Sequence, residues 1–551
     1  MPSIYFFYIF LTSLFTVLVL IPPISRLAVS IGIFDEQDER KLHSGAIPRL
    51  GGIAIFFAVL LGTILFTDID RHTRGFLAGG VVIFLTGLTD DLTGMSPRKK
   101  LLGQFIAALI ATVVGGLGLT SLGDLFGMGP IELDYLSIPF TVFAIVGVIN
   151  AINLLDGLDG LAGGVTAIAA AALGIIAWNT GNQQLVGICV ALLGGVIGFL
   201  KFNSYPAKIF MGDGGSLFLG YCLATVSIHL VEHGGGHVSS MAPVIILAVP
   251  LCDTCFVLVN RLMNRQSISA PDRGHIHHRL MDLGFGHKAT VILVYGLSYI
   301  LAIYAVMFQN IPDRLHLINL VLMLLVFSIL NRVLKTLLKR HPTTFLEDDR
   351  SCLNAFTYRW IVCYSHYLLV AVKYLVMAIL SLTIFITSRP GYELASVAGL
   401  LIILIIGLIF QTKDWSNRFL QFVLYFTGGF LVYVMENYGR DTVMAGVRLN
   451  QLSMYLFIAL FLVSGGLLFL RKKSRLLLGS PLEYFILFTV IAIPLLPPAF
   501  TGPWHLLTVT AKSLILFLSF KLIFMLEARR NRKVIIATLL ALFACGVRSL
   551  M

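Results

Sequence analysis

Residues 138–178 read IPFTVFAIVGVINAINLLDGLDGLAGGVTAIAAAALGIIAW, two apolar runs joined by a short segment rich in Asn, Asp and Gly. A helix that crosses a membrane needs about 20 mostly apolar residues. The runs near 138–152 and 161–178 approach that length and are continuous, unlike barrel strands, which alternate over about ten residues. The stretch therefore predicts an all-α membrane protein with a polar turn between two helices.

The composition of the whole chain agrees with this stretch. Of its 551 residues, 57% are hydrophobic and only 12% are charged, and the mean hydropathy is +0.90. A soluble domain carries about 25% charged residues, and a single core stops growing beyond about 250–300 residues. These values exclude a single soluble globule, a disordered chain and a secreted disulfide scaffold.

Apolar runs recur along the chain and predict a polytopic transmembrane helix bundle of about eighteen helices. About eleven lie near 4–27, 50–67, 75–89, 101–119, 138–152, 161–178, 184–200, 214–231, 241–262, 290–308 and 315–334. About seven more lie near 361–387, 394–411, 419–436, 452–470, 483–500, 505–526 and 534–549. The first run is longer than a signal-peptide core and no Lys or Arg precedes it, so we expect it to be a transmembrane helix.

The basic residues predict the orientation of these helices. With the N-terminus outside, 30 of the 40 Lys and Arg residues fall in inside loops, as the positive-inside rule requires. The net charge of +12 is therefore explained by topology, and we expect no nucleic-acid partner. Contact of some inside Lys and Arg residues with anionic lipid or phosphate substrates stays open.

Five polar loops lie on the predicted inner side, all before residue 290. Their carboxylates at or near predicted helix ends are Asp90, Asp91, Asp156, Asp159 and Asp213. Carboxylates at the mouth of a helix bundle are costly unless they are paired, hydrated or bound to metal. Oxygen ligands suit Mg²⁺, whereas Zn²⁺ prefers His and Cys. A solvated loop end or a contact between helices explains each cluster alone, but five on one side favour a functional site.

Spacing within two of these loops adds to the prediction. Asn150, Asn153, Asp156 and Asp159 are three residues apart, so adjacent pairs would lie close on a helix. Glycines bracket Asp213 just before an apolar run, and a glycine-rich turn that enters a helix suits phosphate. Asp253 lies within a predicted span, where a functional role and hydrogen bonding between helices are equally good explanations.

These blocks resemble the polyprenyl-phosphate N-acetylhexosamine-1-phosphate transferase family, which includes the bacterial undecaprenyl-phosphate GlcNAc-1-phosphate transferases. The matching blocks are 40–43 with 48–52, Asp90-Asp91, 150–160, 210–216 and 275–279. Their order and spacing extend over residues 35–290, and the resemblance covers about 1–340.

The resemblance implies a reaction and its participants. A HexNAc-1-phosphate, expected to be GlcNAc-1-phosphate, passes from a UDP-sugar to undecaprenyl phosphate, giving a polyprenyl-diphosphate sugar and UMP. Two polyanions meet, so a metal is needed to neutralise them; Mg²⁺ is expected, with Mn²⁺ as the alternative. The resemblance places this step at the bacterial inner membrane, with the active site on the cytoplasmic face.

The resemblance also implies roles for individual residues. Asp213 would be the firmest Mg²⁺ ligand, with Asn153 beside it and Asp156 orienting metal or nucleotide. Asp90 is the candidate base and Asp91 could replace it; a covalent aspartyl-phosphate route stays open. The implied substrate-binding residues are Lys41, Arg49, Asn150, Asp159, Lys208, His275, His277, His278 and Arg279.

Two departures from the family pattern qualify these roles. Leu92-Thr93-Gly94 follow the acidic pair, so the third acid found in many relatives is absent. The fifth loop reads His-Ile-His-His, which looks like the GlcNAc branch and differs from the three-histidine run of the phospho-MurNAc-pentapeptide enzymes. A modified HexNAc substrate is left open.

The last third of the chain has no comparable motif. We expect a transferase domain at 1–340, a linker at 341–360 and an additional transmembrane domain at 361–551. The last domain would serve packing, dimerisation or docking, with a second activity and a homodimer left open. The rival for the whole chain is a transporter or binding protein for a lipid-linked sugar, but residues 1–340 and 341–551 show no clear repeat of the kind common in transporters.

Overall fold

The computed structural model describes most of the chain. It covers residues 4–35, 47–234, 238–264, 274–322, 355–385, 391–410, 414–439, 442–444, 447–470, 489, 505–526 and 532–550. The chain forms two compact units, Met1–Glu347 with Ser480–Phe488 and Asp348–Gly479 with Thr489–Met551. The predicted linker at 341–360 lies mostly outside the described residues, so that boundary stays a prediction.

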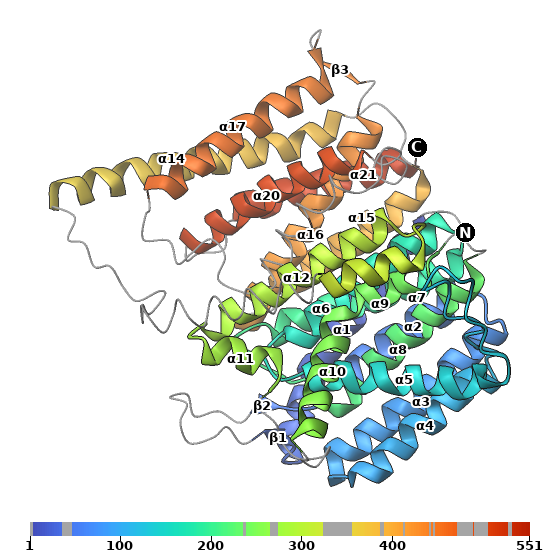
Figure 1. The fold of residues 1–551 in the computed structure, drawn as a ribbon. Coiled ribbons are helices and arrows are strands. Elements are labelled where there is room, and N and C mark those ends of the chain that lie inside the picture. The colour runs from blue at the N-terminus through green and yellow to red at the C-terminus, as the bar shows by residue number, and fades with distance from the viewer. Residues whose placement is uncertain are drawn as a thin grey trace. The chain divides into compact units, whose positions relative to one another are not determined.

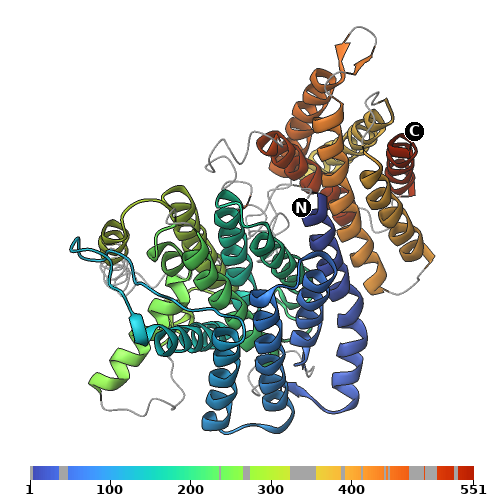
Figure 2. The same ribbon diagram turned by 90° about the vertical axis from the view of Figure 1, so that its right-hand side faces the viewer.

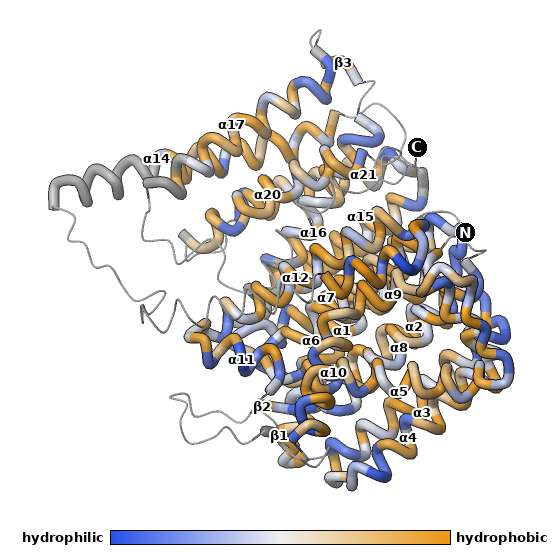
Figure 3. Tube along the Cα trace, viewed as in Figure 1, coloured by the Kyte–Doolittle hydropathy of each residue, from blue (hydrophilic) through white to orange (hydrophobic). Residues whose placement is uncertain are grey.

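The all-α prediction is confirmed in the described residues. The named strands form only two antiparallel pairs, β1 (Phe34–Asp35) with β2 (Ile47–Pro48) and β3 (Val443–Met444) with β4 (Val447–Arg448). Ten helices in this part of the chain are long and apolar enough to cross a membrane, and Figure 3 shows hydrophobic residues along most of their length. The chain is therefore a multi-pass membrane protein.

The first unit is a helix bundle (Figure 1). Its helices are α1 (Ile4–Ser30), α2 (Gly51–Phe66), α3 (Arg71–Thr93), α4 (Pro97–Val113), α5 (Ser137–Leu155), α6 (Leu161–Asn179), α7 (Gln183–Asn203), α8 (Gly212–His233), α9 (Met241–Ile246), α10 (Ala248–Met263), α11 (Ile276–Asp282) and α12 (His287–Met307), with the 3₁₀ turn η1 (Asp134–Leu136) before α5. Figures 1 and 2 show α3 and α4 side by side, joined by a short turn.

Helix α8 is the most buried of the candidate membrane spans. It packs against α2, α3, α5 and α6, and small residues allow two of these approaches to be very close. A Cβ on Gly87 of α3 would lie 2.5 Å from the carbonyl oxygen of Asp213, and one on Gly52 of α2 would lie 2.3 Å from the Gly215 nitrogen. Close packing of small residues is a common way to join membrane helices, and here it fixes the start of α8.

One predicted span differs from the structure. The run 241–262 forms two helices, α9 and α10, with a break at Leu247, whose φ of −93° and ψ of 10° are not helical. Pro250 has no N–H to donate to the preceding turn, which weakens the helix at this point. Most of the spans predicted at 315–334 and 483–500 lie outside the described residues.

The second unit is also helical. Its described elements are α14 (Ala355–Leu382), η2 (Thr383–Phe385), α15 (Tyr392–Phe410), α16 (Asp414–Tyr438), α17 (Leu449–Leu470), α20 (Leu506–Leu526) and α21 (Arg532–Leu550). Lys512 of α20 donates to the carboxylate of Glu436 in α16 and to the hydroxyl of Ser453 in α17, at 2.7 Å for the latter. The side chains of Glu436 and Lys512 are 1% and 10% exposed, so they tie three helices together in the interior.

Candidate active site

The first turn of α8 carries Asp213 and is held by a second carboxylate. Asp91, at the end of α3, accepts the backbone N–H groups of Asp213 at 2.8 Å and Gly214 at 2.9 Å. Gly212 has a φ of +73°, and a Cβ there would lie 2.5 Å from an Asp91 carboxylate oxygen. Only glycine fits this left-handed and crowded position, so the Gly-Asp-Gly sequence produces a fixed turn.

The Asp213 carboxylate gathers polar groups from several segments. Lys100 at the start of α4 donates to it at 2.8 Å, and the Asn153 amide of α5 donates at 2.7 Å. Arg49, between β2 and α2, approaches it at 3.5 Å. The Asn153 amide also donates to Ser216, one turn along α8, at 2.8 Å. We call Arg49, Asp90, Asp91, Lys100, Asn153 and Asp213 the Asp213 cluster.

The two acids at the end of α3 have different surroundings. The Asp91 side chain is 2% exposed and both of its oxygens accept backbone N–H groups. The Asp90 side chain is 12% exposed; one oxygen accepts the N–H of Met95 at 2.6 Å and the other lies 3.1 Å from the Lys100 ammonium. Asp91 is thus committed to the fold of α8, whereas Asp90 shares Lys100 with Asp213.

The four polar residues spaced by three do not act as one group, because α5 ends at Leu155. Asn153 joins the Asp213 cluster, but Asn150 exchanges hydrogen bonds of 2.7 and 3.2 Å with Gln104 of α4. Asp159 accepts the N–H of Ala207 at 2.9 Å and so holds the turn before α8.

Asp156 directly follows α5. Along the chain it lies between Asn153, which joins the Asp213 cluster, and Asp159, which holds the turn before α8. Burial, and then the negative charge of Asp213, raise the pKa of Asp156 to about 7. Both effects disfavour the ionised carboxyl group. Asp156 therefore titrates near neutral pH.

The predicted histidines lie on and just before α11. A Cβ on Gly157 would lie 2.5 Å from Nε2 of His277, so this imidazole packs directly on the loop that follows Asp156. Burial, and then the neighbouring His278, lower the pKa of His277 to about 4, so it is neutral at pH 7. The His277 and His278 ring centroids are 4.3 Å apart, and Arg279 lies over the Phe256 ring at 4.5 Å.

Two other predicted residues are not placed in the Asp213 cluster. The backbone of Lys208 donates to the Phe202 carbonyl in the turn before α8. Lys41 lies outside the described residues.

The donor set of the Asp213 cluster suits a hard cation in chemical type, since it contains carboxylates and an amide that can present its oxygen after rotation. Across the described residues, however, no three or more His, Cys, Asp or Glu side chains are grouped so that they could hold one metal ion. The Lys100 ammonium lies between Asp90 and Asp213, at 3.1 and 2.8 Å, and its single charge is shared by the two carboxylates. A cation at Asp213 would share or replace that contact.

Sequence reasoning missed several of these polar residues. Lys100 is the last of three consecutive basic residues, and in the sequence these three indicate only which side of the membrane the loop lies on. Asn203 at the end of α7 accepts the Gly160 N–H at 2.9 Å and donates to the Ile209 carbonyl at 2.9 Å, so it joins the loop at Gly160 to the turn before α8. Tyr295 of α12 donates to the Gly160 carbonyl at 2.6 Å. No local pattern marks these long-range contacts.

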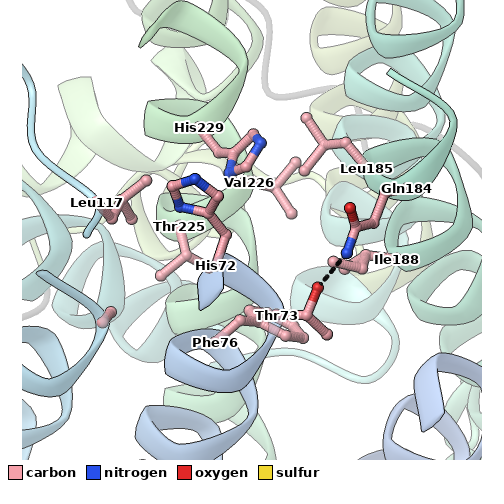
Figure 4. A pocket seen from close by; sticks show the side chains of 11 residues that line it. His72, Thr73, Phe76, Leu117, Gln184, Leu185, Ile188, Thr225, Val226 and His229 are labelled. Carbon is pink, nitrogen blue, oxygen red and sulfur yellow. Dashed lines mark hydrogen bonds between the residues drawn. The ribbon is translucent and has the colours of Figure 1, made fainter. Parts of the chain in front are cut away.

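A small cavity lies at the other ends of α3 and α8, away from the Asp213 cluster. Figure 4 shows His72 and His229 beside it, with Gln184 donating to Thr73. The His72 ring centroid is 4.9 Å from that of His229 and 4.7 Å from that of His233. The cavity and the Asp213 cluster are therefore two separate regions of the first unit.

Comparison with known proteins agrees with the geometry. A family model described as glycosyl transferase family 4 matches residues 73–231. A Bacillus subtilis (strain 168) protein named "Probable undecaprenyl-phosphate N-acetylglucosaminyl 1-phosphate transferase" is 37% identical over 326 residues, 59% of this chain and 90% of that protein. Proteins named "Undecaprenyl-phosphate alpha-N-acetylglucosaminyl 1-phosphate transferase" are 30% identical in Yersinia pestis, covering 56% of this chain and 86% of that protein, and 32% identical in Salmonella typhi, covering 50% and 77%. The resemblance seen in the motifs is confirmed: the chain belongs to the polyprenyl-phosphate N-acetylhexosamine-1-phosphate transferases of glycosyl transferase family 4.

Proposed function

We propose that this protein transfers GlcNAc-1-phosphate from UDP-GlcNAc to undecaprenyl phosphate, with UMP as the second product. The names of its relatives support this reaction. The observation that carries the proposal is the Asp213 cluster, in which Asp213, Lys100 and Asn153 meet within 2.8 Å contacts. A first step in the synthesis of a surface polysaccharide follows from these substrates.

The cationic side chains of the cluster match the charge of the substrates. Arg49 is 40% exposed and Lys100 is 18% exposed, so both can turn toward a diphosphate without leaving the site. Preorganised positive groups of this kind stabilise charge that shifts during phosphoryl transfer. Every member of the cluster comes from one chain, so a homodimer is not needed to complete it.

In the proposed reaction an oxygen of the lipid phosphate attacks the β-phosphorus of UDP-GlcNAc. The bond from that phosphorus to the bridging oxygen breaks, and UMP leaves with the oxygen. Asp91 is 2% exposed, and both of its oxygens hold the α8 backbone. Asp90 takes any proton that remains on the lipid phosphate, because its side chain is 12% exposed and one oxygen faces the Lys100 side chain, which can turn to a substrate. This help is modest, since a phosphate's second ionisation has a pKa of roughly 6.

A divalent metal is part of this proposal. Mg²⁺ held by Asp213 and Asn153, with Mn²⁺ as an alternative, would neutralise the diphosphate and align it. Asp156 and Asp159 would help to orient the nucleotide, and His275, His277, His278 and Arg279 would contact the diphosphate or sugar, with Lys41, Lys208 and Asn150 in support.

The distribution of Lys and Arg supports a site on the cytoplasmic face of the bacterial inner membrane. The Asp213 cluster includes Arg49 and Lys100, which belong to two of the basic loops on this side.

The test is lipid product formation by purified full-length protein in detergent or proteoliposomes. We expect UDP-[³H]GlcNAc, undecaprenyl phosphate and Mg²⁺ to give a labelled lipid and an equal amount of UMP, and EDTA to stop both. No labelled lipid with any UDP-HexNAc would refute the proposal. Sugar or lipid movement across vesicles without UMP release would favour the rival transporter.

A further inference from the structure

A single acid, Asp253, lies within the apolar helix α10. The residue is 7% exposed and its side chain only 4%. A carboxylate in such a place is costly unless its oxygens have partners. The structure shows those partners, which are His275 and Ile276 at the start of α11.

Both oxygens of Asp253 bind the start of α11. One accepts the backbone N–H of Ile276 at 2.7 Å, and the other lies 2.9 Å from Nδ1 of His275. The first contact satisfies one of the free N–H groups that every helix start leaves. The second contact involves a histidine whose side chain is only 8% exposed.

The contact with His275 has a chemical consequence beyond packing. An ionised carboxylate can only accept hydrogen bonds, so Nδ1 of His275 must carry a proton. The neighbour of one ring nitrogen thus decides what the other nitrogen can do. Asp253 makes Nε2 the nitrogen of His275 that is left for a ligand.

Asp253 also connects to the loop after α5 through the same segment. The His275 and His277 rings are parallel, with centroids 5.8 Å apart and planes 6° apart. His277 packs on Gly157, next to Asp156. The start of α11, fixed by Asp253, therefore sets where both imidazoles stand relative to Asp156.

We propose that Asp253 is a positioning residue, which orients His275 so that Nε2 meets the diphosphate of the UDP-sugar. This inference rests on the proposed function, because that function supplies the diphosphate. Asp253 touches no substrate itself and acts through His275.

The test is Asp253→Asn in the full-length protein. Asn has one acceptor oxygen where Asp has two, and the backbone of Ile276 is the less movable partner. We expect the Asn oxygen to keep the Ile276 contact and its amide NH₂ to face Nδ1, which reverses the His275 tautomer. Loss of such an orienting partner typically costs about 10–100-fold in activity, so kcat/KM for UDP-GlcNAc should fall by about that factor. The KM for undecaprenyl phosphate should stay unchanged.

A matched control and a double variant separate orientation from simple loss of structure. Thr254→Val, at the next position of α10, removes a buried hydroxyl that meets no hydrogen-bond partner among the described residues, and it should retain wild-type kcat/KM. On a His275→Ala background, Asp253→Asn should cause no further loss, because residues that act as one unit are not additive. Multiplying losses would mean that Asp253 acts independently of His275 and would overturn the inference.

Failure of this inference can be told from failure of the proposed function. If the wild type forms labelled lipid and Asp253→Asn matches it, only the inference is overturned. If the wild type forms no labelled lipid, the proposed function fails. The role of Asp253 is then tested by the increase in melting temperature that UDP causes. A smaller increase in Asp253→Asn than in Thr254→Val supports the positioning role, and equal increases overturn it.

Discussion

The Asp213 cluster of the first unit and the Glu436–Lys512 pair of the second are both charged groups inside a membrane protein, but they differ in access. Side chains in the cluster are exposed by 40% at Arg49, 18% at Lys100 and 17% at Asp213. In the pair, Glu436 is 1% exposed and Lys512 is 10% exposed. A cluster that ligands can reach is suited to bind them, whereas a closed pair is suited to hold helices together.

The number of neighbouring charges separates the two regions further. Asp213 alone has two cationic partners and an amide, and Asp90 shares one of the cations. Lys512 has the Glu436 carboxylate and a Ser453 hydroxyl. Crowded charges around a reachable carboxylate are typical of sites with tuned ionisation. Variants in each region should therefore change different quantities.

The largest effect is expected for Asp213→Asn. The amide keeps the shape of the side chain, and the backbone contact of residue 213 with Asp91 is unchanged. The charge that balances Lys100 and supports a cation is lost, so kcat should fall by about 10³-fold, as when a key electrostatic group is removed. Asp282→Asn, an exposed acid at the end of α11, is the matched control and should be fully active. Wild-type turnover by Asp213→Asn would remove this carboxylate from the reaction.

Much of this comparison could be anticipated from sequence, and the rest could not for identifiable reasons. Apolar runs located the helices because length and hydropathy are local properties. The acidic pair and Asp213 were found because each lies at a helix end with glycines or a second acid beside it. Lys100 was not distinguished from Lys99 and Arg98, since only the packing of α4 against α3 decides which of them reaches Asp213.

Asp253 also shows the limit of prediction from sequence, which offered two explanations for it. A hydrogen bond between membrane helices and a functional role were equally consistent with its position. The structure shows the hydrogen bonding, because its carboxylate joins α10 to the start of α11, and the functional role is what Asp253→Asn tests. Similarly, a spacing of three residues loses meaning after Leu155, because the helix ends there and Asp159 binds the turn at Ala207.

An intermediate effect is expected from pH. Because the pKa of Asp156 is raised to about 7, about one tenth of this group is ionised at pH 6 and about nine tenths at pH 8. The added negative charge favours a cation, so kcat/KM at subsaturating Mg²⁺ should rise up to about tenfold over this range. In Asp156→Asn the rise in kcat/KM should be smaller, because only the ionisation of the lipid phosphate, with a pKa of roughly 6, then contributes to it. An identical profile in the variant would show that Asp156 does not control the rate.

The same shift has an opposite effect on stability. The folded state keeps the proton of Asp156 up to about pH 7, whereas an unfolded chain loses it near the usual aspartate pKa of 3.8. The folded state therefore binds more protons between about pH 4 and 7, and its stability falls as pH rises through that window. Asp156→Asn should be more stable than wild type at pH 8 and similar to it at pH 4, as measured by thermal unfolding in detergent.

The smallest effect on transferase activity is expected for Glu436→Gln. This variant leaves the Lys512 ammonium buried without its counter-charge, and breaking a buried pair costs about 3–5 kcal/mol. The melting temperature should fall clearly, while kcat/KM of the folded fraction should stay within about twofold of wild type, well below a tenfold change of 1.4 kcal/mol. Ser464→Ala, which removes a neutral buried hydrogen bond to Ser519, is the matched control and should cost about 1 kcal/mol. Loss of lipid product in Glu436→Gln at unchanged stability would break the comparison, because the closed pair would then serve the reaction and not the packing of α16, α17 and α20.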